Sequence, residues 1–380
     1  MPARVLVVSS RFPWPVVTGD RIRALAWLEA LSARAQVTLV APPGAVPAGA
    51  PACDFVPAHR SLPQLVLAGA RVVREGLPVT SLLAAGYGWR RALRIAGERG
   101  GPFDVAIVML ARLDPWVFSA LSARRRVFDA IDSLAANLAE RAQAARGPVR
   151  WAWAFEQRRT ARIEADAASR YDRTLVVAEA ERAAFGTRAV AVFHGVAIAP
   201  LVELPRRWDV GFWGRLAYFA NRDAVRVLLE QIWPQVRTAR PDATLVVAGA
   251  DAPAFVRRYD GRDGITVVSP MADRGALLRQ VRVALFPLRF GTGQSNKVLE
   301  AGEAGCALIA TPQAVRGLPG VAEHALIAGG AAGLAEHALA LLAAPGAASA
   351  RGRSLRALVE RDFSRDHACR QLAAIVLEEG

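Results

Sequence analysis

Short apolar runs alternate with longer stretches of helical periodicity along the first half of the chain. Residues 21–33 carry apolar side chains at helical spacing and predict an amphipathic helix. The apolar runs predict buried strands at 4–8, 36–40, 104–109, 126–130 and 174–178. Strands that alternate with helices predict a parallel sheet covered by helices on both faces.

The same pattern restarts in the second half, after a stretch at 199–207 that is rich in Pro and Arg and predicts a linker. An Ala-rich run near 325–345 predicts a helix. Further strands are predicted at 209–213, 244–249, 265–268, 283–286 and 307–310. Two successive units of this kind predict an α/β protein with two Rossmann-like doubly wound domains that face each other across a cleft.

The predicted boundaries follow from these patterns. The first domain covers residues 1–198 and the second covers residues 199–362. A final segment, 363–380, contains an amphipathic helix at about 365–378 that we expect to pack back on the first domain. A length of 380 residues agrees with two domains.

Charge adds information because it is uneven. The net charge is +14, and 47 of the 48 basic residues are arginines, which makes the lone Lys297 conspicuous. Residues 1–200 hold 26 arginines against 16 acidic residues, whereas the remainder holds 22 basic against 18 acidic residues. The basic first half suits nucleic acid, an anionic membrane surface or a phosphorylated acceptor, or it is a solvated Arg-rich face. We expect no nucleic-acid partner.

The cysteines and the apolar segments of the sequence predict a cytoplasmic protein. The three cysteines, Cys53, Cys306 and Cys369, have no disulfide or metal spacing, which is typical of reduced thiols. The apolar run near the N-terminus soon reaches Arg11 and lacks the features of a signal peptide. No stretch approaches 18 clean apolar residues, so we expect no spanning helix.

The most informative segment is the Gly-rich loop at 290–295 that leads into a predicted helix. Gly291 and Gly293 let the backbone approach a ligand closely. The amides at a helix N-terminus form an anion site suited to phosphate, and Lys297 adds a charge in the first turn. Glu300 lies three residues later on the same helix face and is the kind of carboxylate that holds ribose hydroxyls. An ordinary loop with an ion pair is the alternative.

A second segment follows the first strand of the second domain. Gly214 and Arg215 come directly after the strand at 209–213. This position places a guanidinium at the mouth of the predicted cleft, where it suits a diphosphate. One surface arginine among 47 is the alternative interpretation.

These two segments, in this order, resemble retaining glycosyltransferases of family 4, which have the GT-B fold. The resemblance includes residues 194–196 and 232–234, and it is strongest over 174–320. In detail, the chain is similar to the branch that acts in bacterial exopolysaccharide assembly, also at residues 11–23. It implies a hexosyltransferase of polysaccharide biosynthesis that moves a sugar from a nucleotide-diphosphate sugar to a glycan, lipid-linked or small-molecule acceptor.

The resemblance also implies site roles. The first domain would be the acceptor side, with Gly19 and Asp20 near the acceptor, and the second domain would bind the donor. Arg215 and Lys297 would stabilise the leaving diphosphate, and Glu300 would hold the ribose. The donor-binding set is Gly214, Arg215, Met271, Gly291, Thr292, Gly293, Gln294, Ser295, Asn296, Lys297 and Glu300.

The chain departs from the family at three places. Thr292 stands where the family usually has the first of two glutamates. Asn221 stands where the family often has a lysine, six residues after the arginine, and in our interpretation Lys297 supplies the missing positive charge. No histidine follows the strand at 104–109. The candidates for a role related to that of this histidine are Arg112, Asp114, Asp129 and Asp132. Of these, we prefer Asp132 as a catalytic residue.

No metal-ligand spacing is present, so we expect transfer without a metal and with no cofactor besides the sugar-nucleotide co-substrate. Two rival functions stay open: an inactive GT-B subunit that binds a nucleotide sugar or a partner, and an epimerase-type enzyme. A nicotinamide oxidoreductase is disfavoured because no glycine fingerprint follows the first strand.

Two short segments mix aromatic and basic residues. They lie at 150–154 and 88–91 and are typical of interfacial segments, which favours a peripheral contact with an anionic membrane at its inner face. Tryptophans of the core are the alternative.

Overall fold

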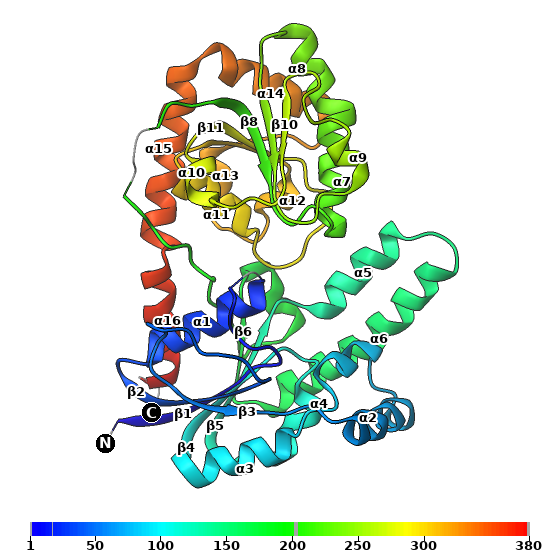
Figure 1. Cartoon of the computed structure of the whole chain (residues 1–380), viewed down its shortest axis with the longest axis vertical. Helices are drawn as coiled ribbons and strands as arrows, with labels where there is room; N and C mark the ends of the chain where they lie inside the picture. Colours follow the sequence, from blue (N-terminus) through cyan, green and yellow to red (C-terminus); the bar gives the residue numbers. More distant parts are fainter. Residues whose placement is uncertain (1, 17, 201–203, 378–380) are drawn as a thin grey trace. The chain divides into compact units, whose positions relative to one another are not determined.

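The computed structural model describes residues 2–16, 18–200 and 204–377. The chain forms two compact units, each built on one parallel sheet (Figure 1). The first unit comprises Met1–His194, Thr292–Gln294 and Asp366–Gly380, and the second comprises Gly195–Gly291 and Ser295–Arg365. Two doubly wound α/β units confirm the predicted fold class.

Within the described residues, the first unit holds a seven-stranded sheet of order β3-β2-β1-β4-β5-β6-β7. The strand order reverses beside β1, as it does in doubly wound sheets. Its strands are β1 (Ala3–Val8), β2 (Ala35–Ala41), β3 (Asp54–Pro57), β4 (Phe103–Met109), β5 (Ala123–Ile131), β6 (Arg173–Val176) and β7 (Ala189–Ala191).

The alternation of β1 explains why both faces of this sheet are covered. Val5 and Val7 point into one core cluster, whereas Leu6 and Val8 point into the other. The covering helices include α1 (Gly19–Leu31), α2 (Leu62–Glu75), α3 (Trp89–Gly100), α4 (Asp114–Val117), α5 (Leu134–Ala144) and α6 (Pro148–Arg170). Short 3₁₀ turns are η1 (Val79–Ala84), η2 (Phe118–Ala120) and η3 (Glu179–Ala184).

The last helix, α16 (Arg365–Leu377), packs in the first unit. Its Leu372 and Val376 share a core cluster with Trp27 of α1. Arg125 of β5 donates from NH2 to the carbonyl oxygen of Val376 at 2.8 Å. The end of the chain therefore completes the core that its beginning starts.

The second unit has a six-stranded parallel sheet within the described residues, of order β10-β9-β8-β11-β12-β13. Its strands are β8 (Trp208–Trp213), β9 (Leu245–Ala248), β10 (Ile265–Val268), β11 (Val281–Phe286), β12 (Ala307–Ala310) and β13 (Ala325–Ile327). Its helices include α7 (Phe219–Val227), the π-helical turn η4 (Leu228–Ile232), α8 (Trp233–Ala239), α9 (Ala254–Arg257), α10 (Arg274–Leu278), α11 (Asn296–Glu303), α12 (Pro312–Val315), α13 (Val321–His324), α14 (Ala331–Ala343) and α15 (Pro345–Asp362).

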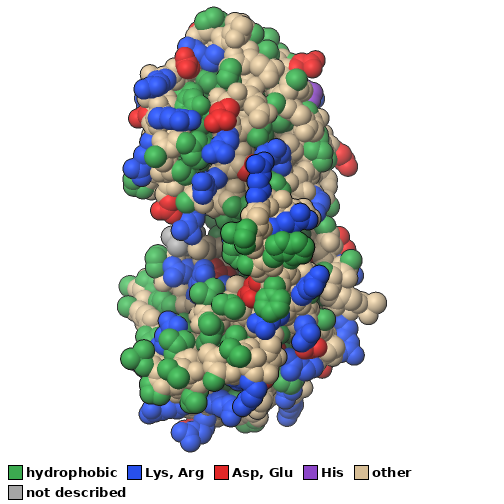
Figure 2. Space-filling view, turned by 90° about the vertical axis from the view of Figure 1, so that its right-hand side faces the viewer, with side chains coloured by type: hydrophobic (Ala, Val, Ile, Leu, Met, Phe, Trp, Pro, Cys, Tyr) green, Lys and Arg blue, Asp and Glu red, His purple; other side chains and the backbone are tan. Residues whose placement is uncertain are grey.

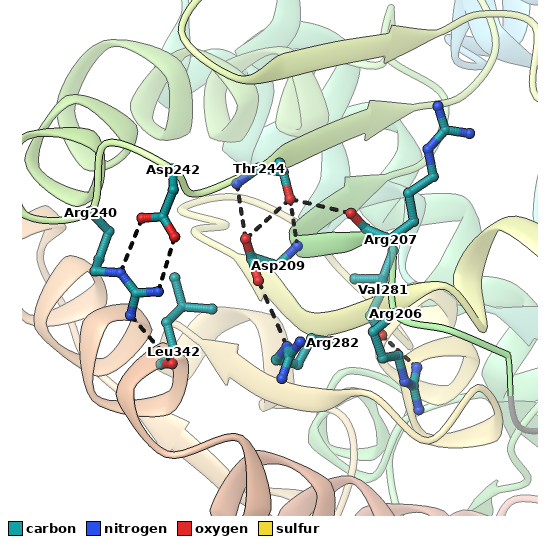
Figure 3. A network of polar contacts seen from close by, with 9 residues as sticks. All are labelled: Arg206, Arg207, Asp209, Arg240, Asp242, Thr244, Val281, Arg282 and Leu342. Carbon is teal, nitrogen blue, oxygen red and sulfur yellow. Dashed lines mark hydrogen bonds and ion pairs between the residues drawn. The ribbon is translucent and has the colours of Figure 1, made fainter.

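A polar network joins the amino ends of β8, β9 and β11 (Figure 3). The Asp209 carboxylate accepts from the backbone N of Thr244 at 3.0 Å and from its Oγ1 at 3.1 Å. Arg282 lies 3.7 Å from the same carboxylate, and Arg206 donates to the carbonyl of Val281. Arg206 and Arg282 therefore help to hold the amino ends of these strands in place.

The sequence-based elements differ from the structure in detail. The short strands β3, β7 and β13 were not predicted, and β13 occupies the start of the Ala-rich run, so that the helix α14 begins only at Ala331. Part of the predicted linker, residues 201–203, lies outside the described residues. In the described chain, no single helix is long and apolar enough to cross a membrane, although α14 and α15, bent by 108°, together meet that criterion by length and composition.

Candidate functional site

Two glycines shape the carboxyl ends of β8 and β9. Gly214 has φ 142° and Gly249 has φ 149°, a region that L side chains rarely adopt. A Cβ atom at Gly249 would lie 1.7 Å from the carbonyl oxygen of Gly214. The chain therefore needs glycine here, because two strand ends approach each other more closely than any side chain allows.

Lys297 lies in the first turn of α11, beside these strand ends. Its Nζ donates to Oδ1 of Asn221 and lies 5.2 Å from the centroid of the Phe212 ring. A Cβ at Gly214 would lie 3.6 Å from Cε of Lys297. Burial lowers the pKa of Lys297 to about 8, against the opposing effect of Glu300. The structure therefore places the lone lysine against Asn221, the position where the family often has one.

Glu300 is held by two partners that are distant in sequence. Its Oε2 accepts from Nε1 of Trp213 at 2.9 Å, and its Oε1 accepts from Arg274 at 2.6 Å. Burial raises the pKa of Glu300, although Arg274 and the Trp213 hydrogen bond act in the opposite direction. Trp213 and Arg274 were not predicted as site residues, because no spacing in the sequence connects them with Glu300.

Arg215 lies at the same edge but is engaged elsewhere. Its Nε donates to Oδ2 of Asp251 at 2.8 Å, and its side chain is 67% exposed. Asp251 itself has a positive φ of 57°. An exposed ion pair of this kind is worth little, so Arg215 is available to a diphosphate at small cost.

The Gly-rich loop before α11 is anchored at one end. The carbonyl oxygen of Gly291 accepts from Nε2 of Gln313 at 2.7 Å. Ser295 is the N-cap residue of α11, yet its buried Oγ has no hydrogen-bond partner in the described chain. Asn296 begins the helix. An orphaned hydroxyl at a helix N-terminus is a place where an anion finds a donor.

Met271 follows β10, in the loop that leads to α10. The loop passes the Ser269–Pro270 bond, and Oγ of Ser269 accepts from the backbone N of Ala252 at 3.3 Å. Asp273 then caps α10, because its Oδ1 accepts from the backbone N of Ala276 at 2.9 Å. This cap orients Arg274, the partner of Glu300.

Residues 292–294 of the Gly-rich loop belong to the first unit by their contacts. The backbone N of Gly293 donates to Oε1 of Glu181 at 2.8 Å, and Oγ1 of Thr292 donates to Asp132 at 3.3 Å. Oε1 of Gln294 accepts from the backbone N of His194 at 2.9 Å. The position where the family has its first glutamate thus holds a hydroxyl that hydrogen-bonds to Asp132.

Asp132 follows β5 in the first unit and lies in an acidic cluster with Glu164 and Glu181. The backbone N of Ser133 donates to Glu181 at 2.6 Å, and its Oγ donates to Glu164 at 2.9 Å. Burial, and then the nearby Glu181, raise the pKa of Asp132 to about 6. Burial also raises the pKa of Glu164 to about 7. Glu164 and Glu181 were missed by the sequence analysis, since each lies on a different element from Asp132.

Asp20 lies in the first turn of α1 between two arginines. Its Oδ2 is 3.3 Å from Arg11 and 3.5 Å from Arg112. Gly19 begins α1, and a Cβ there would lie 3.6 Å from Nε2 of His194. Burial and Arg11 lower the pKa of Arg112, whereas Asp20 and Asp132 act against this shift. Arg112 and Asp20 thus form a polar cluster near Asp132.

Two of the acidic candidates have structural roles. Asp129 is fully buried and accepts from Arg23 at 2.6 Å and from Nε1 of Trp27 at 2.6 Å. Asp114 pairs with Arg170 and accepts from the Tyr171 hydroxyl at 3.0 Å. The other two candidates, Asp132 and Arg112, lie instead at the polar cluster with Asp20. The described residues contain no group of three or more His, Cys, Asp or Glu side chains that could hold a metal ion.

Part of the second unit is similar to a known protein family. Residues 207–344 match the family model described as glycosyl transferases group 1. No curated protein sequence matches the chain.

Solved structures similar to the chain share its fold at low sequence identity. Sucrose-phosphate synthase from Thermosynechococcus elongatus has a TM-score of 0.74 at 14% identity, with 99% of both chains covered. HepE of Anabaena, in complex with UDP and glucose, has a TM-score of 0.66 at 13% identity, with 100% of both chains covered. The crystal structure of TarM has a TM-score of 0.56 at 11% identity, covering 72% of this chain and only 54% of TarM.

Proposed function

We propose that the chain is a glycosyltransferase, and in particular a retaining hexosyltransferase; its GT-B-like fold and the group 1 match at 207–344 support this. The donor is a nucleotide-diphosphate sugar, as in the neighbouring HepE structures with UDP and UDP-glucose. The acceptor is a glycan, a lipid-linked sugar or a small molecule, in polysaccharide biosynthesis. Retention of the anomeric configuration is proposed from the resemblance to family 4.

One observation carries the donor site: a lone lysine, an orphaned hydroxyl and a helix N-terminus meet at the carboxyl edge of one sheet. Lys297 lies in the first turn of α11 and Ser295 is its N-cap residue, and Gly214 leaves out the side chain that would fill the space beside Lys297. Each of these features favours a diphosphate, through charge, hydrogen bonding or close backbone approach. Their combination supports this function better than any one of them does.

The residues of the second unit divide the work of donor binding. Lys297 and Arg215 would stabilise the negative charge that develops on the departing nucleotide diphosphate. Glu300, already held by Trp213 and Arg274, would accept from the ribose hydroxyls. The loop at Met271, which precedes the helix of Arg274, would contact the base.

The residues of the first unit would handle the acceptor. Asp132 is the group that we propose to receive the proton of the attacking hydroxyl, because its pKa of about 6 leaves it mostly ionised at neutral pH while it still accepts protons readily. Asp20, beside Gly19, would orient the acceptor. Its hydrogen bond from Thr18 and its two arginine neighbours hold this carboxylate in place.

We propose that transfer needs no metal ion and no cofactor, because Lys297 and Arg215 supply the positive charge that the leaving group requires. Activity is then expected to be the same in EDTA and in magnesium. We also propose a cytoplasmic location, which the lack of disulfide spacing among the three cysteines of the sequence supports.

The test is transfer from radiolabelled UDP-, GDP-, ADP- and TDP-sugars by the purified protein, supplied with a crude glycan and lipid extract as acceptor. We expect nucleotide release with one donor, and this release is expected to rise when acceptor is added. NMR is expected to show that the glycosidic bond of the product has the same axial or equatorial configuration as the donor. Nucleotide binding without any release would instead favour an inactive GT-B subunit. Conversion of the sugar without release would favour an epimerase.

A further inference from the structure

Exposed large hydrophobic side chains gather on one part of the first unit. In the described chain, all but two of them lie on α2, on η1 or at the start of α6, the exceptions being Val16 and Val46. They are Leu62, Val66, Leu67, Val73, Val79, Leu83, Val149, Trp151 and Phe155, and we call these nine residues the α2–α6 surface. Single exposed apolar residues are common, but a gathering of this size marks an interaction site.

The helix α2 shows the feature most clearly. Only Ala68 and Val72 of its 14 residues are buried. Leu62, Val66 and Val73 follow helical spacing along its opposite, solvent-facing side, and their side chains are 78%, 72% and 79% exposed. Among the described residues, nothing covers this apolar side of α2.

Hydrogen bonds join the three elements into one surface. The Glu156 carboxylate of α6 accepts from the backbone N of Val79 at 2.9 Å and of Thr80 at 2.6 Å, both in η1. Arg159 of α6 donates to the carbonyl oxygen of Leu77, which lies between α2 and η1, at 3.1 Å. The start of α6, with Trp151 and Phe155, is thus fixed beside η1 and the end of α2.

The charges around this surface are mostly positive. Residues 60–75 hold three arginines and one acidic residue, Glu75, and residues 141–162 hold six arginines and one acidic residue, the buried Glu156. Glu75 is paired with Arg71 and Arg74. Figure 2 looks onto the side that carries α5 and α6, and in its lower half hydrophobic and basic side chains lie intermixed.

We propose that the α2–α6 surface docks on an anionic lipid bilayer. Exposed Trp, Phe and Leu side chains enter the boundary between headgroups and acyl chains, and the surrounding arginines bind the lipid phosphates. A protein partner would need an acidic surface of matching shape, whereas a bilayer satisfies both the apolar side chains and the excess positive charge. The predicted segment at 150–154 belongs to this surface, but that at 88–91 does not, because Trp89 is buried and donates to the carbonyl oxygen of Ala84 at 2.7 Å.

The experiment is cosedimentation of the full chain with vesicles of phosphatidylcholine alone and of phosphatidylcholine with 30% phosphatidylglycerol, at low and high salt. We expect binding to the anionic vesicles only, weakened by salt. Trp151→Ser combined with Leu67→Ser, both at exposed positions, is expected to lower the partition coefficient on the order of tenfold. Arg150→Gln combined with Arg158→Gln is expected to lower it and to reduce its salt dependence.

Matched controls are Val46→Ser, an exposed apolar position outside the surface, and Arg257→Gln combined with Arg353→Gln, which removes the same charge from the second unit. These variants are expected to bind vesicles as the wild type does. Absence of binding, or equal binding by the surface variants, would overturn the proposal, and so would a dimer in sedimentation velocity that Trp151→Ser dissociates. Nucleotide binding is expected to be unchanged in every variant, so failure of membrane docking is distinguishable from failure of the proposed transferase function.

Discussion

The two ends of the strands β8, β9 and β11 in the second unit differ in what their charged side chains contact. At the amino ends, these side chains bind each other and the backbone. At the carboxyl ends, they lie beside glycines and a helix N-terminus. Asp209 at the amino end accepts from both the N and the Oγ1 of Thr244 (Figure 3). At the carboxyl end, Ser295 keeps an orphaned Oγ and Lys297 keeps a depressed pKa. The same strands therefore carry a structural end and an end that we propose as the chemical end.

This difference helps to separate the arginines that stabilise the fold from those that we propose for ligand binding. Arg206 and Arg240 contact backbone carbonyls of their own unit, so their charge serves the fold. Arg215, beside Gly214, and Arg274 instead form ion pairs through side chains that are 67% and 56% exposed, and we propose that a ligand phosphate competes for them. Changes of charged side chains at the amino end should alter stability, and changes of charged side chains at the carboxyl end should alter ligand binding.

The largest stability effect is expected from a glycine at the chemical end. Gly249→Ala places a Cβ 1.7 Å from the Gly214 carbonyl oxygen and is expected to lower the free energy of unfolding by about 3 kcal/mol or more. Gly261→Ala is the control, since Gly261 also has a positive φ but has nothing within 4 Å, and it is expected to cost about 1 kcal/mol. Equal losses in chemical denaturation would show that the close approach of the strand ends is not real.

At the structural end, Asp209→Ala leaves the backbone N of Thr244 without its acceptor. The expected loss is about 1–3 kcal/mol in the free energy of unfolding, with no change in nucleotide affinity. Denaturant titration and calorimetric nucleotide binding on the same sample check both halves. A fall in affinity without loss of stability would break the division between the two ends.

The pH dependence of nucleotide binding tests Lys297 itself. Its pKa of about 8 means that the ammonium form, which attracts a diphosphate, predominates below pH 8 and is lost above it. We expect nucleotide-diphosphate affinity to fall about three- to tenfold between pH 7 and pH 9. Lys297→Arg stays charged over this range, so its profile is expected to be flat. A profile that is identical in both proteins would assign the titration to another group.

The smallest effect is expected at Arg274, which holds Glu300 from an exposed position. Its side chain is 56% exposed, so Arg274→Ala is expected to raise the KM for the donor by only about two- to fivefold. Arg279→Ala is a poor control because Arg279 pairs with Glu303, whereas Arg257→Ala is a suitable one. A loss of more than a hundredfold would mean that Arg274 contacts the donor directly.

The sequence predicted those strands and helices that depend on a local pattern of apolar residues. The long apolar runs became strands of both sheets, and the Gly-rich loop before Lys297 leads into α11 as predicted. The short strands β3, β7 and β13 were missed because three or four residues carry too little periodicity. Whether the site residues act as proposed stays a prediction.

Pairings over long distances could not be predicted. Trp213 lies 87 residues from Glu300 and Arg274 lies 26 residues away, and only the fold brings them together. The sequence likewise favoured Asp132 over Asp114 and Asp129, but provided no account of what surrounds each carboxylate. Burial separated them, because Asp129 is enclosed by Arg23 and Trp27 whereas Asp132 keeps a raised pKa.

The most direct test of the account is calorimetric binding of UDP, GDP, ADP and TDP to the wild type, to Lys297→Met and to Arg282→Met. We predict that one nucleotide binds the wild type, that Lys297→Met weakens this binding at least about tenfold, and that Arg282→Met at the structural end leaves it unchanged. Equal affinity in Lys297→Met and in the wild type, or no binding of any nucleotide, would contradict the claim that the carboxyl end of this sheet is the donor site.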